Sequence, residues 1–235
     1  MSSYGGGLVE GDDIRLSVHC KSNATLYLST QAFTKIYKNP SGIPSRQRIR
    51  GTLSEEACAV VLPDPVVPYA NSIFHQDQHW TLKPGALLIL ADGHTSGRYA
   101  CGERFAYTEY ISNITVSTEK RPILIERYRS HPATLPTTAP GRFGPFNTAF
   151  NLYIVGDIED PRFTRITSHL KTEFIPHIAP SQTPSDIMIS CTNPKPNIFI
   201  ARALVYRTGD LTPLLNTIGQ ALPGVLGANP LERKY

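Results

Sequence analysis

One carboxylate ends a run of apolar residues. Glu126 closes the string Pro122-Ile123-Leu124-Ile125-Glu126. A glutamate buried in an apolar strand is uncommon unless it has a partner or a bound cation. Two interpretations stay open. Either Glu126 faces a cation inside the protein, or it is the outward residue of an alternating strand and pairs with Arg127.

Two aspartates raise the same question. Asp12 closes the string Gly6-Gly7-Leu8-Val9-Glu10-Gly11-Asp12. It is either an acid facing an internal passage for a divalent cation or a turn carboxylate that accepts hydrogen bonds from backbone amides, and the residue pattern alone favours the turn. Asp92 lies a few residues before a Gly-Arg pair. Carboxylate oxygens bind a borderline divalent metal loosely enough to release it, whereas a thiolate cage would retain it.

Histidines and cysteines offer a different chemistry. His94 and Cys101 could form the thiol-imidazole pair of a small hydrolase, but no third group that would orient the imidazole is evident. His75 and His79 would share one strand face, nearly two repeats apart, which is too far for one metal without a bend. A solvated or packed state is the more common one for each histidine.

A compact polar motif runs from Gly97 to Phe105, Gly-Arg-Tyr-Ala-Cys-Gly-Glu-Arg-Phe. Glycines permit tight turns and close backbone approach. Arg98 follows the first glycine, and Glu103 follows Gly102. The arginine and the glutamate are expected either to form an ion pair that orders two turns or to line a polar interior or interface.

Composition excludes several classes of protein. The 235 residues are 40% apolar and 18% charged, with a net charge of +4 and no block of like charge, which indicates a globular chain that does not bind nucleic acid. No apolar run approaches membrane-spanning length, no signal peptide is evident, and the four cysteines form no CxxC pair, so we predict a cytoplasmic protein. The nucleotide motif G-x-x-x-x-G-K-[ST] is missing, so no GTP hydrolysis is expected.

The elements that would position these residues are mainly strands. Alternating or β-branched runs separated by turn residues predict strands at 14–19, 24–37, 46–53, 57–62, 73–82, 86–91, 105–117, 123–129, 148–155, 186–191 and 197–206. Residues 131–146 are predicted to be a Pro-rich loop. Pro161 is predicted to open a helix that Pro176 ends, and residues 210–221 are predicted to form a second helix capped by Asp210.

Four strings in order carry a family resemblance. The first is the glycine-rich string 6–12 and the last is the polar motif 97–105. Between them lie first Thr30-Gln31-Ala32-Phe33-Thr34-Lys35-Ile36-Tyr37 and then Leu62-Pro63-Asp64-Pro65-Val66-Val67-Pro68-Tyr69-Ala70. Together they resemble the UreD (also called UreH) family of urease accessory proteins, best over 1–130. The chain looks like a eukaryotic, fungal-like member that starts late in the family's strand order. One UreD-like domain over 1–235 is expected, with a loop at 131–146 and C-terminal strands and helices over 147–235.

The resemblance implies a fold and a set of sites. The family's fold is a helical stack of β-sheets, a β-solenoid-like architecture, with one or two helices in the C-terminal third. By motif position the family's nickel-passage acids map onto Asp12, Asp92 and Glu126. The remaining motif residues are expected to be structural or to lie at an interface: Asp64, Arg98, Gly102 and Glu103.

The resemblance also implies a function. It predicts a non-catalytic chaperone that scaffolds apo-urease with the F accessory protein and the G accessory GTPase. It would pass nickel to the urease active site, binding nickel only transiently and holding no cofactor tightly. Two alternatives stay open: a diverged protein-interaction paralogue without nickel handling, and the hydrolase that uses Cys101 and His94.

Overall fold

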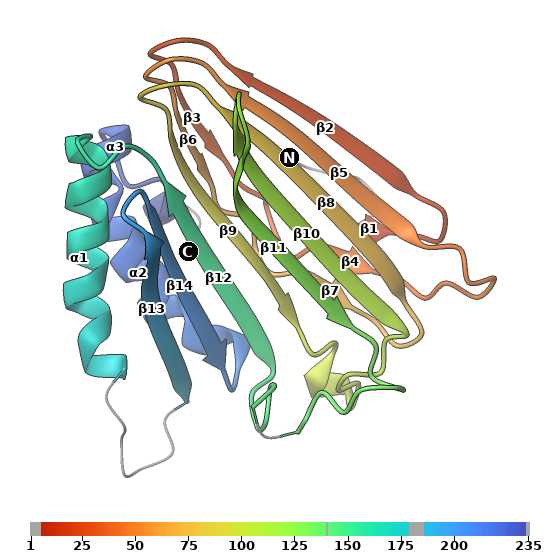
Figure 1. Ribbon diagram of the computed structural model, residues 1–235. Helices are drawn as coiled ribbons and strands as arrows, with labels where there is room; N and C mark the ends of the chain where they lie inside the picture. The colour runs from red at the N-terminus through yellow and green to blue at the C-terminus, as the bar shows by residue number, and fades with distance from the viewer. Residues whose placement is uncertain (1–5, 140, 179–185, 234–235) are drawn as a thin grey trace.

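Strands dominate the protein. The computed structural model describes residues 6–139, 141–178 and 186–233. Strands make up 44% of the chain and helices 18%, which confirms the mainly β class predicted from the sequence. Two large sheets face each other, and the helices cover the side of one sheet that points away from the other (Figure 1).

The first large sheet has five strands in the order β11-β10-β8-β5-β2. Their bounds are β2 (Asp13–Cys20), β5 (Ser45–Leu53), β8 (Ile73–Leu82), β10 (Glu109–Thr118) and β11 (Pro122–Ser130). Strands β2, β5, β8 and β10 pair in parallel, and β11 returns antiparallel to β10. Parallel neighbours cannot be joined by a hairpin, so the chain must travel through another layer between them.

The second large sheet provides that layer. It has six strands in the order β13-β14-β12-β9-β6-β3. Their bounds are β3 (Thr25–Leu28), β6 (Cys58–Val61), β9 (Leu87–Thr95), β12 (Thr148–Val155), β13 (Ile187–Lys195) and β14 (Ile198–Val205). Strands β3, β6 and β9 are parallel, whereas β12, β14 and β13 join them as an antiparallel extension.

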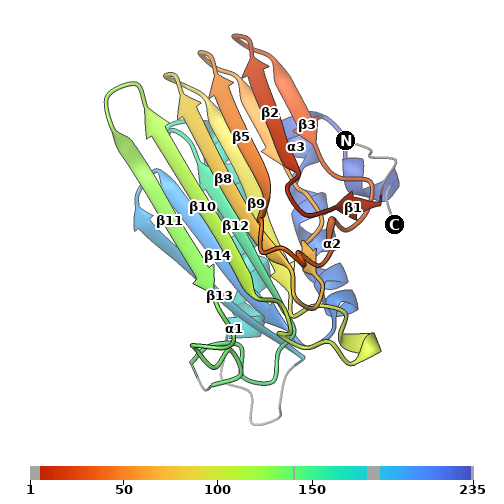
Figure 2. The ribbon, with the colours of Figure 1, turned by 90° about the vertical axis from the view of Figure 1, so that its right-hand side faces the viewer.

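A short third sheet closes each coil of the chain. Its strands β1 (Gly7–Leu8), β4 (Lys35–Ile36) and β7 (Val67–Pro68) are also parallel. The chain therefore winds three times through small sheet, five-stranded sheet and six-stranded sheet, and each coil stacks on the one before (Figure 2). This arrangement confirms the predicted β-solenoid-like fold, although the coils do not correspond to a recognisable sequence repeat.

The space between the large sheets holds an apolar layer. We call Trp80, Leu90 and Ile114, with the buried side chains around them, the apolar level. In β8 the inward positions are Phe74, Gln76, Gln78, Trp80 and Leu82, all at most 5% exposed, because side chains alternate between the two faces of a strand. Strand β9 is buried on both faces, since its other side packs against the helices.

The helices lie in the C-terminal third, as predicted. They are α1 (Pro161–Ile178), α2 (Thr212–Ala221) and the short α3 (Pro223–Leu226), with 3₁₀ turns η1 (Tyr99–Cys101), η2 (Thr208–Leu211) and η3 (Pro230–Arg233). The predicted apolar face of α1 packs on the six-stranded sheet through Phe163, Ile166, Leu170 and Phe174. Among the described helices, none is long and apolar enough to cross a membrane.

Several predicted boundaries are wrong. Helix α1 continues past Pro176 to Ile178, because a proline removes only its own backbone N–H donor and leaves the next two residues free to keep helical angles. Asp210 lies inside η2, where its carboxylate accepts a hydrogen bond from the Arg207 amide, and α2 begins two residues later. The single strand predicted at 24–37 is two strands, β3 and β4, with an irregular corner between them.

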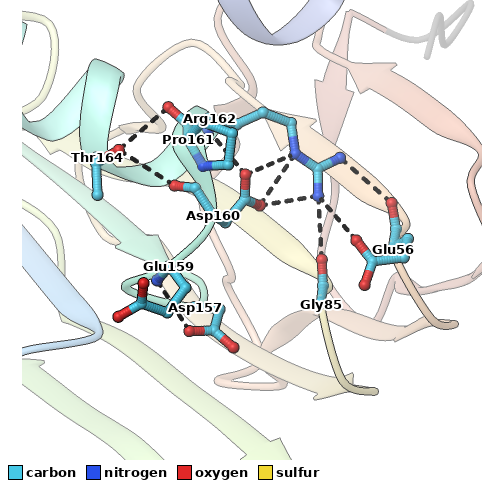
Figure 3. A network of polar contacts seen from close by, with 8 residues as sticks. All are labelled: Glu56, Gly85, Asp157, Glu159, Asp160, Pro161, Arg162 and Thr164. Carbon is cyan, nitrogen blue, oxygen red and sulfur yellow. Dashed lines mark hydrogen bonds and ion pairs between the residues drawn. The ribbon is translucent and has the colours of Figure 1, made fainter.

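Arg162 fixes the start of α1 to the turns of two coils (Figure 3). Its guanidinium donates to both carboxylate oxygens of Asp160, at 3.1 and 3.0 Å, and to the carbonyl oxygens of Glu56 (3.3 Å) and Gly85 (3.1 Å). Glu56 precedes β6 and Gly85 precedes β9. One side chain thus joins the helical layer to the end of the sandwich that carries the apolar level.

Candidate metal passage between the sheets

In both large sheets, polar side chains face the interior at the same position along the strands. Gln47 on β5 is in register with Gln76 on β8, which is in register with Ser112 on β10. In the opposite sheet Asp92, Asn151 and Arg202 are in register on β9, β12 and β14. We call these six residues the polar level. It lies between the apolar level and an aromatic cluster that contains Phe74, Tyr110 and Phe143.

Asp92 joins the two halves of the polar level. It is 8% exposed, the Gln76 amide donates to its Oδ1 at 2.7 Å, and the Ser112 hydroxyl donates to its Oδ2 at 2.9 Å. Burial raises the pKa of Asp92, the Ser112 and Gln76 hydrogen bonds oppose that rise, and the charge of Glu126 adds to it. A nearby cation would favour the charged carboxylate.

Cavities open on both sides of Asp92. A cavity of about 570 Å³ lies towards β11 and β14, and Asp92 lines it together with Glu126 and Arg202. A smaller one, of about 50 Å³, lies towards β2 and β3, and Asp92 lines it together with Gln76 and Asp64. Thr30, Thr34 and Gln47 line both this smaller cavity and a third, of about 150 Å³, at the small sheet. Polar side chains therefore follow one another across the sandwich.

Glu126 stands at the wide end of this path. Its carboxylate accepts hydrogen bonds from the Arg202 guanidinium at 2.6 and 3.4 Å, and Arg202 also donates to the Asn151 side chain at 3.2 Å. Burial lowers the pKa of Arg202, but the interactions with Glu126 and Tyr153 together outweigh that effect and the net change is upward. The alternative ion pair between Glu126 and Arg127 is not observed, since the Arg127 guanidinium donates to the Thr115 hydroxyl and to the carbonyl oxygens of Ile114 and Glu126.

Asp12 is not brought together with the other two predicted metal acids. Its carboxylate accepts a hydrogen bond from the Val9 amide at 2.8 Å, which closes the glycine-rich turn. Among the described residues that line the three cavities above, Asp12 is not included. The geometry is that of the turn interpretation, and a role for Asp12 in nickel transfer stays a prediction.

One of the four motif residues, Asp64, lies beside the smaller cavity. Asp64 is 8% exposed, accepts a hydrogen bond from the Thr30 hydroxyl at 3.1 Å and lines the small cavity beside Asp92. Sequence reasoning placed Asp64 only in a structural or interface motif. Its position makes it a third acid along the polar path, after Glu126 and Asp92.

Arg98 and Glu103 form the expected ion pair. The Arg98 Nε donates to Glu103 at 2.9 Å, the Glu103 carboxylate accepts from the Ala70 amide at 3.1 Å, and the guanidinium lies 4.1 Å from the centre of the Tyr69 ring. Gly102 has a φ of 80°, which suits glycine after the 3₁₀ turn. Whether this motif also contacts a partner stays a prediction.

The hydrolase interpretation loses its geometric basis. His94 is 3% exposed and burial lowers its pKa to about 3, so the imidazole is a poor base at neutral pH. Cys101 lies exposed on η1. His75 instead contacts Glu109, at 2.8 Å. Among the residues described, no three His, Cys, Asp or Glu side chains gather as a metal-binding group.

Comparison with known proteins decides the family. The family model described as UreD urease accessory protein matches residues 1–234. The urease accessory protein UreD of Cytophaga hutchinsonii is 32% identical over 238 residues, covering 98% of this chain and 83% of that protein. That of Sorangium cellulosum is 32% identical over 235 residues, covering 100% and 72%. The chain belongs to the UreD family.

Membership confirms the family predicted from the four strings and ties the chain to urease maturation. The urease accessory protein D of Arabidopsis thaliana is also similar, 34% identical over 146 residues, covering 56% of this chain and 50% of that protein. Bacterial and plant UreD proteins are thus both among its relatives.

Sequence reasoning missed most of the polar level in this UreD protein. Gln76, Ser112 and Arg202 were not singled out, although they hold the two acids in place. The signal was present in β8, where inward positions read Phe74, Gln76, Gln78 and Trp80, with amides between large apolar residues. A search for polar side chains at inward positions of apolar strands would have found it.

Proposed function

We propose that this UreD protein is a non-catalytic accessory protein that gives nickel a sheltered path to apo-urease. The observation that carries the proposal is that Asp92 lines cavities on both of its sides, one of them shared with Glu126 and the other with Asp64. Three carboxylates thus follow a path that crosses the interior between the two large sheets. A cation entering at Glu126 would meet Asp92 before Asp64.

The chemistry of this path suits transfer better than storage. Its donors are carboxylate, amide and hydroxyl oxygens from Asp92, Gln76 and Ser112. Such hard oxygen donors hold a borderline divalent ion loosely, because that ion prefers nitrogen and sulfur donors. An ion can therefore move from one acid to the next without a large barrier to leaving.

The Glu126–Arg202 pair regulates the wide end in this proposal. Without a cation, Arg202 neutralises Glu126 through the hydrogen bond of 2.6 Å. An arriving nickel ion competes with the guanidinium for the same oxygens. Since the Arg202 side chain is 44% exposed, it has room to swing away when the ion binds.

Family membership supports a proposal about partners, because it ties the chain to urease maturation. We propose that the protein bridges apo-urease, the F accessory protein and the G accessory GTPase, and that nickel released by the GTPase enters the path. The Pro-rich loop at 131–146 is a contact element in this proposal, because Thr137, Arg142 and Phe143 lie beside the wide cavity. Purification of the tagged chain from cells that express all four proteins tests the assembly.

The nickel path is tested by removing charge without changing shape. Asp92→Asn and Glu126→Gln are introduced into the chain and co-expressed with urease and the other accessory proteins. Asp77→Asn is the matched control, since Asp77 lies on β8 between Gln76 and Gln78 and alternation turns it to the outer face. We expect both path variants to lower the nickel content of urease and its activity, while the control leaves both unchanged.

The same preparations separate path from scaffold. Path variants that still co-purify with urease but yield nickel-poor enzyme support the proposal. Nickel-replete urease from both path variants would refute the path. If the chain were nevertheless required for activation, it would act only as a protein-interaction member of the family.

A further inference from the structure

Some buried polar atoms on side chains near Asp92 have no hydrogen-bond partner in the described part of the chain. They include the His94 Nε2 and the hydroxyls of Tyr110 and Tyr153. His94 lines the wide cavity together with Asp92, and the Tyr110 ring stacks on the imidazole with centroids 4.3 Å apart. Buried polar atoms nearly always have a partner, so an unpartnered nitrogen on a residue that lines a cavity points to a ligand or an ion.

Packing alone does not explain a histidine at this position. The His94 ring lies among Tyr110, Tyr128 and Phe143, with centroid separations of 4.3, 4.8 and 5.4 Å. A phenyl ring would make the same contacts and would avoid burying a nitrogen without a partner. The imidazole nitrogen is therefore the feature that distinguishes this residue from an aromatic filler.

Strand geometry brings His94 and Asp92 to one site. They are two residues apart on β9 and both face the interior, because alternate residues share a face. Their α-carbons are separated by roughly 6.6 Å at about 3.3 Å per residue. Two side chains at that separation can reach one ion placed between their tips.

We propose that His94 binds metal with Asp92, and that this nitrogen and oxygen pair selects a borderline divalent cation inside the path. The inference rests on the proposed nickel path and adds its selectivity. Oxygen donors alone favour magnesium and calcium, which are abundant in cells, whereas an imidazole nitrogen favours nickel and its neighbours in the first transition row. His94 would make the path discriminate against magnesium.

The test compares nickel and magnesium binding to the full chain by calorimetric titration. His94→Phe keeps the ring packing and removes the nitrogens, and His94→Gln is a second variant that keeps a polar side chain. His79→Gln is the matched control, because His79 is an exposed histidine on β8. We expect the two His94 variants to weaken nickel binding by about tenfold or more, with no change in magnesium binding and none in the control.

A spectroscopic measurement gives an independent readout. X-ray absorption at the nickel edge, with one equivalent of nickel bound, should show imidazole scattering in the unaltered chain and in His79→Gln. The signal should be lost in His94→Phe or, if that variant does not fold, in His94→Gln. If neither His94 variant folds, the unaltered chain and His79→Gln decide the test. An imidazole signal in both supports the inference, and a missing imidazole signal in the unaltered chain overturns it.

Asp92→Asn distinguishes this inference from the proposed function. If Asp92→Asn weakens nickel binding and the His94 variants do not, the path stands and His94 is only an aromatic packing residue. If neither substitution changes nickel binding, the path itself is wrong and the inference falls with it.

Discussion

The interior between the two large sheets has an apolar level and a polar level only a few residues apart on the same strands. On β8, Trp80 belongs to the first and Gln76 to the second. On β9, Leu90 and Asp92 stand at consecutive inward positions. Side chains of the apolar level need only fill space, whereas each side chain of the polar level needs a particular partner. The comparison teaches that the same strands can contribute stability at one position along their length and the groups of the proposed metal path at another.

The two levels should differ in what they contribute to folding. Apolar burial stabilises roughly in proportion to the area removed from water, about 25 cal/mol per Å². A hydrogen bond such as Gln76 to Asp92 replaces a bond to water and adds only about 1 kcal/mol net. We therefore expect substitutions in the apolar level to unfold the protein and substitutions in the polar level to change metal transfer.

The largest effect on stability is expected from Trp80→Ala. The indole is 1% exposed and lies against Gly51, where an added Cβ would stand 2.0 Å from the ring. Removing it leaves a cavity and should lower the free energy of unfolding by about 3–5 kcal/mol. Urea denaturation measures this, with Trp80→Phe as a milder control. A loss below about 1 kcal/mol would show that the apolar level is not the main source of stability.

A smaller loss of stability is expected from a substitution of Arg162, which lies at the end of the sandwich nearest the apolar level. Arg162→Met keeps the aliphatic stem but removes the hydrogen bonds to Asp160, Glu56 and Gly85. Hydrogen bonds to charged groups contribute about 1–3 kcal/mol, so the free energy of unfolding should fall by that amount. Arg165→Met, an exposed position on the same helix, is the control and should change it by about 0.5 kcal/mol or less. Equal losses in both variants would contradict a specific role for the Arg162 contacts.

The Arg98–Glu103 pair predicts a pH dependence. The hydrogen bond from Arg98 holds the pKa of Glu103 below its ordinary value, although burial opposes this. A carboxyl whose pKa is lowered by folding stabilises the protein above the unfolded pKa, about 4.3, and that contribution is lost as pH falls through the folded value. The stability difference between the unaltered chain and Arg98→Met should therefore be present at neutral pH and vanish in acid.

Chemical denaturation at several pH values measures that difference. A difference that persists unchanged in acid would mean that Arg98 acts through its contact with the Tyr69 ring, 4.1 Å from the guanidinium, and not through the charge of Glu103. Either outcome tells whether Arg98 stabilises the fold through its charge or through packing.

The fold was predictable from sequence because its signals are local. The strand-like run at 73–82 and the buried strand predicted at 148–155 have the bounds of β8 and β12, and the spacing of Phe163, Ile166, Leu170 and Phe174 predicted the buried face of α1. The strand predicted at 86–91 ends before β9 does, because Asp92 and His94 are residue types common in loops, and only the partner strands show that they are buried.

The site was less predictable because its partners are distant in sequence. Arg202 lies 76 residues from Glu126, and Ser112 lies 20 residues from Asp92. No spacing rule links such pairs, since their proximity depends on how the coils stack. Asp92 and Glu126 could be proposed from their motifs, whereas the hydrogen bonds that hold them follow only from the register of the sheets.

The smallest effect on stability is expected from Asp92→Asn, at the centre of the polar level. The amide has nearly the shape of the carboxylate, and its hydrogen bonds with Gln76 and Ser112 can be kept, since the Gln76 amide can flip and the hydroxyl can rotate. Because burial disfavours the ionised carboxyl group, replacing it with the neutral amide should leave the free energy of unfolding unchanged or raise it by up to about 1 kcal/mol. Urea denaturation of Asp92→Asn beside Trp80→Ala tests the contrast directly. A loss above about 2 kcal/mol would mean that the carboxylate is needed for folding. A fully stable Asp92→Asn that fails to load urease with nickel would mean that the protein keeps this carboxyl group in its interior for the metal and not for the fold.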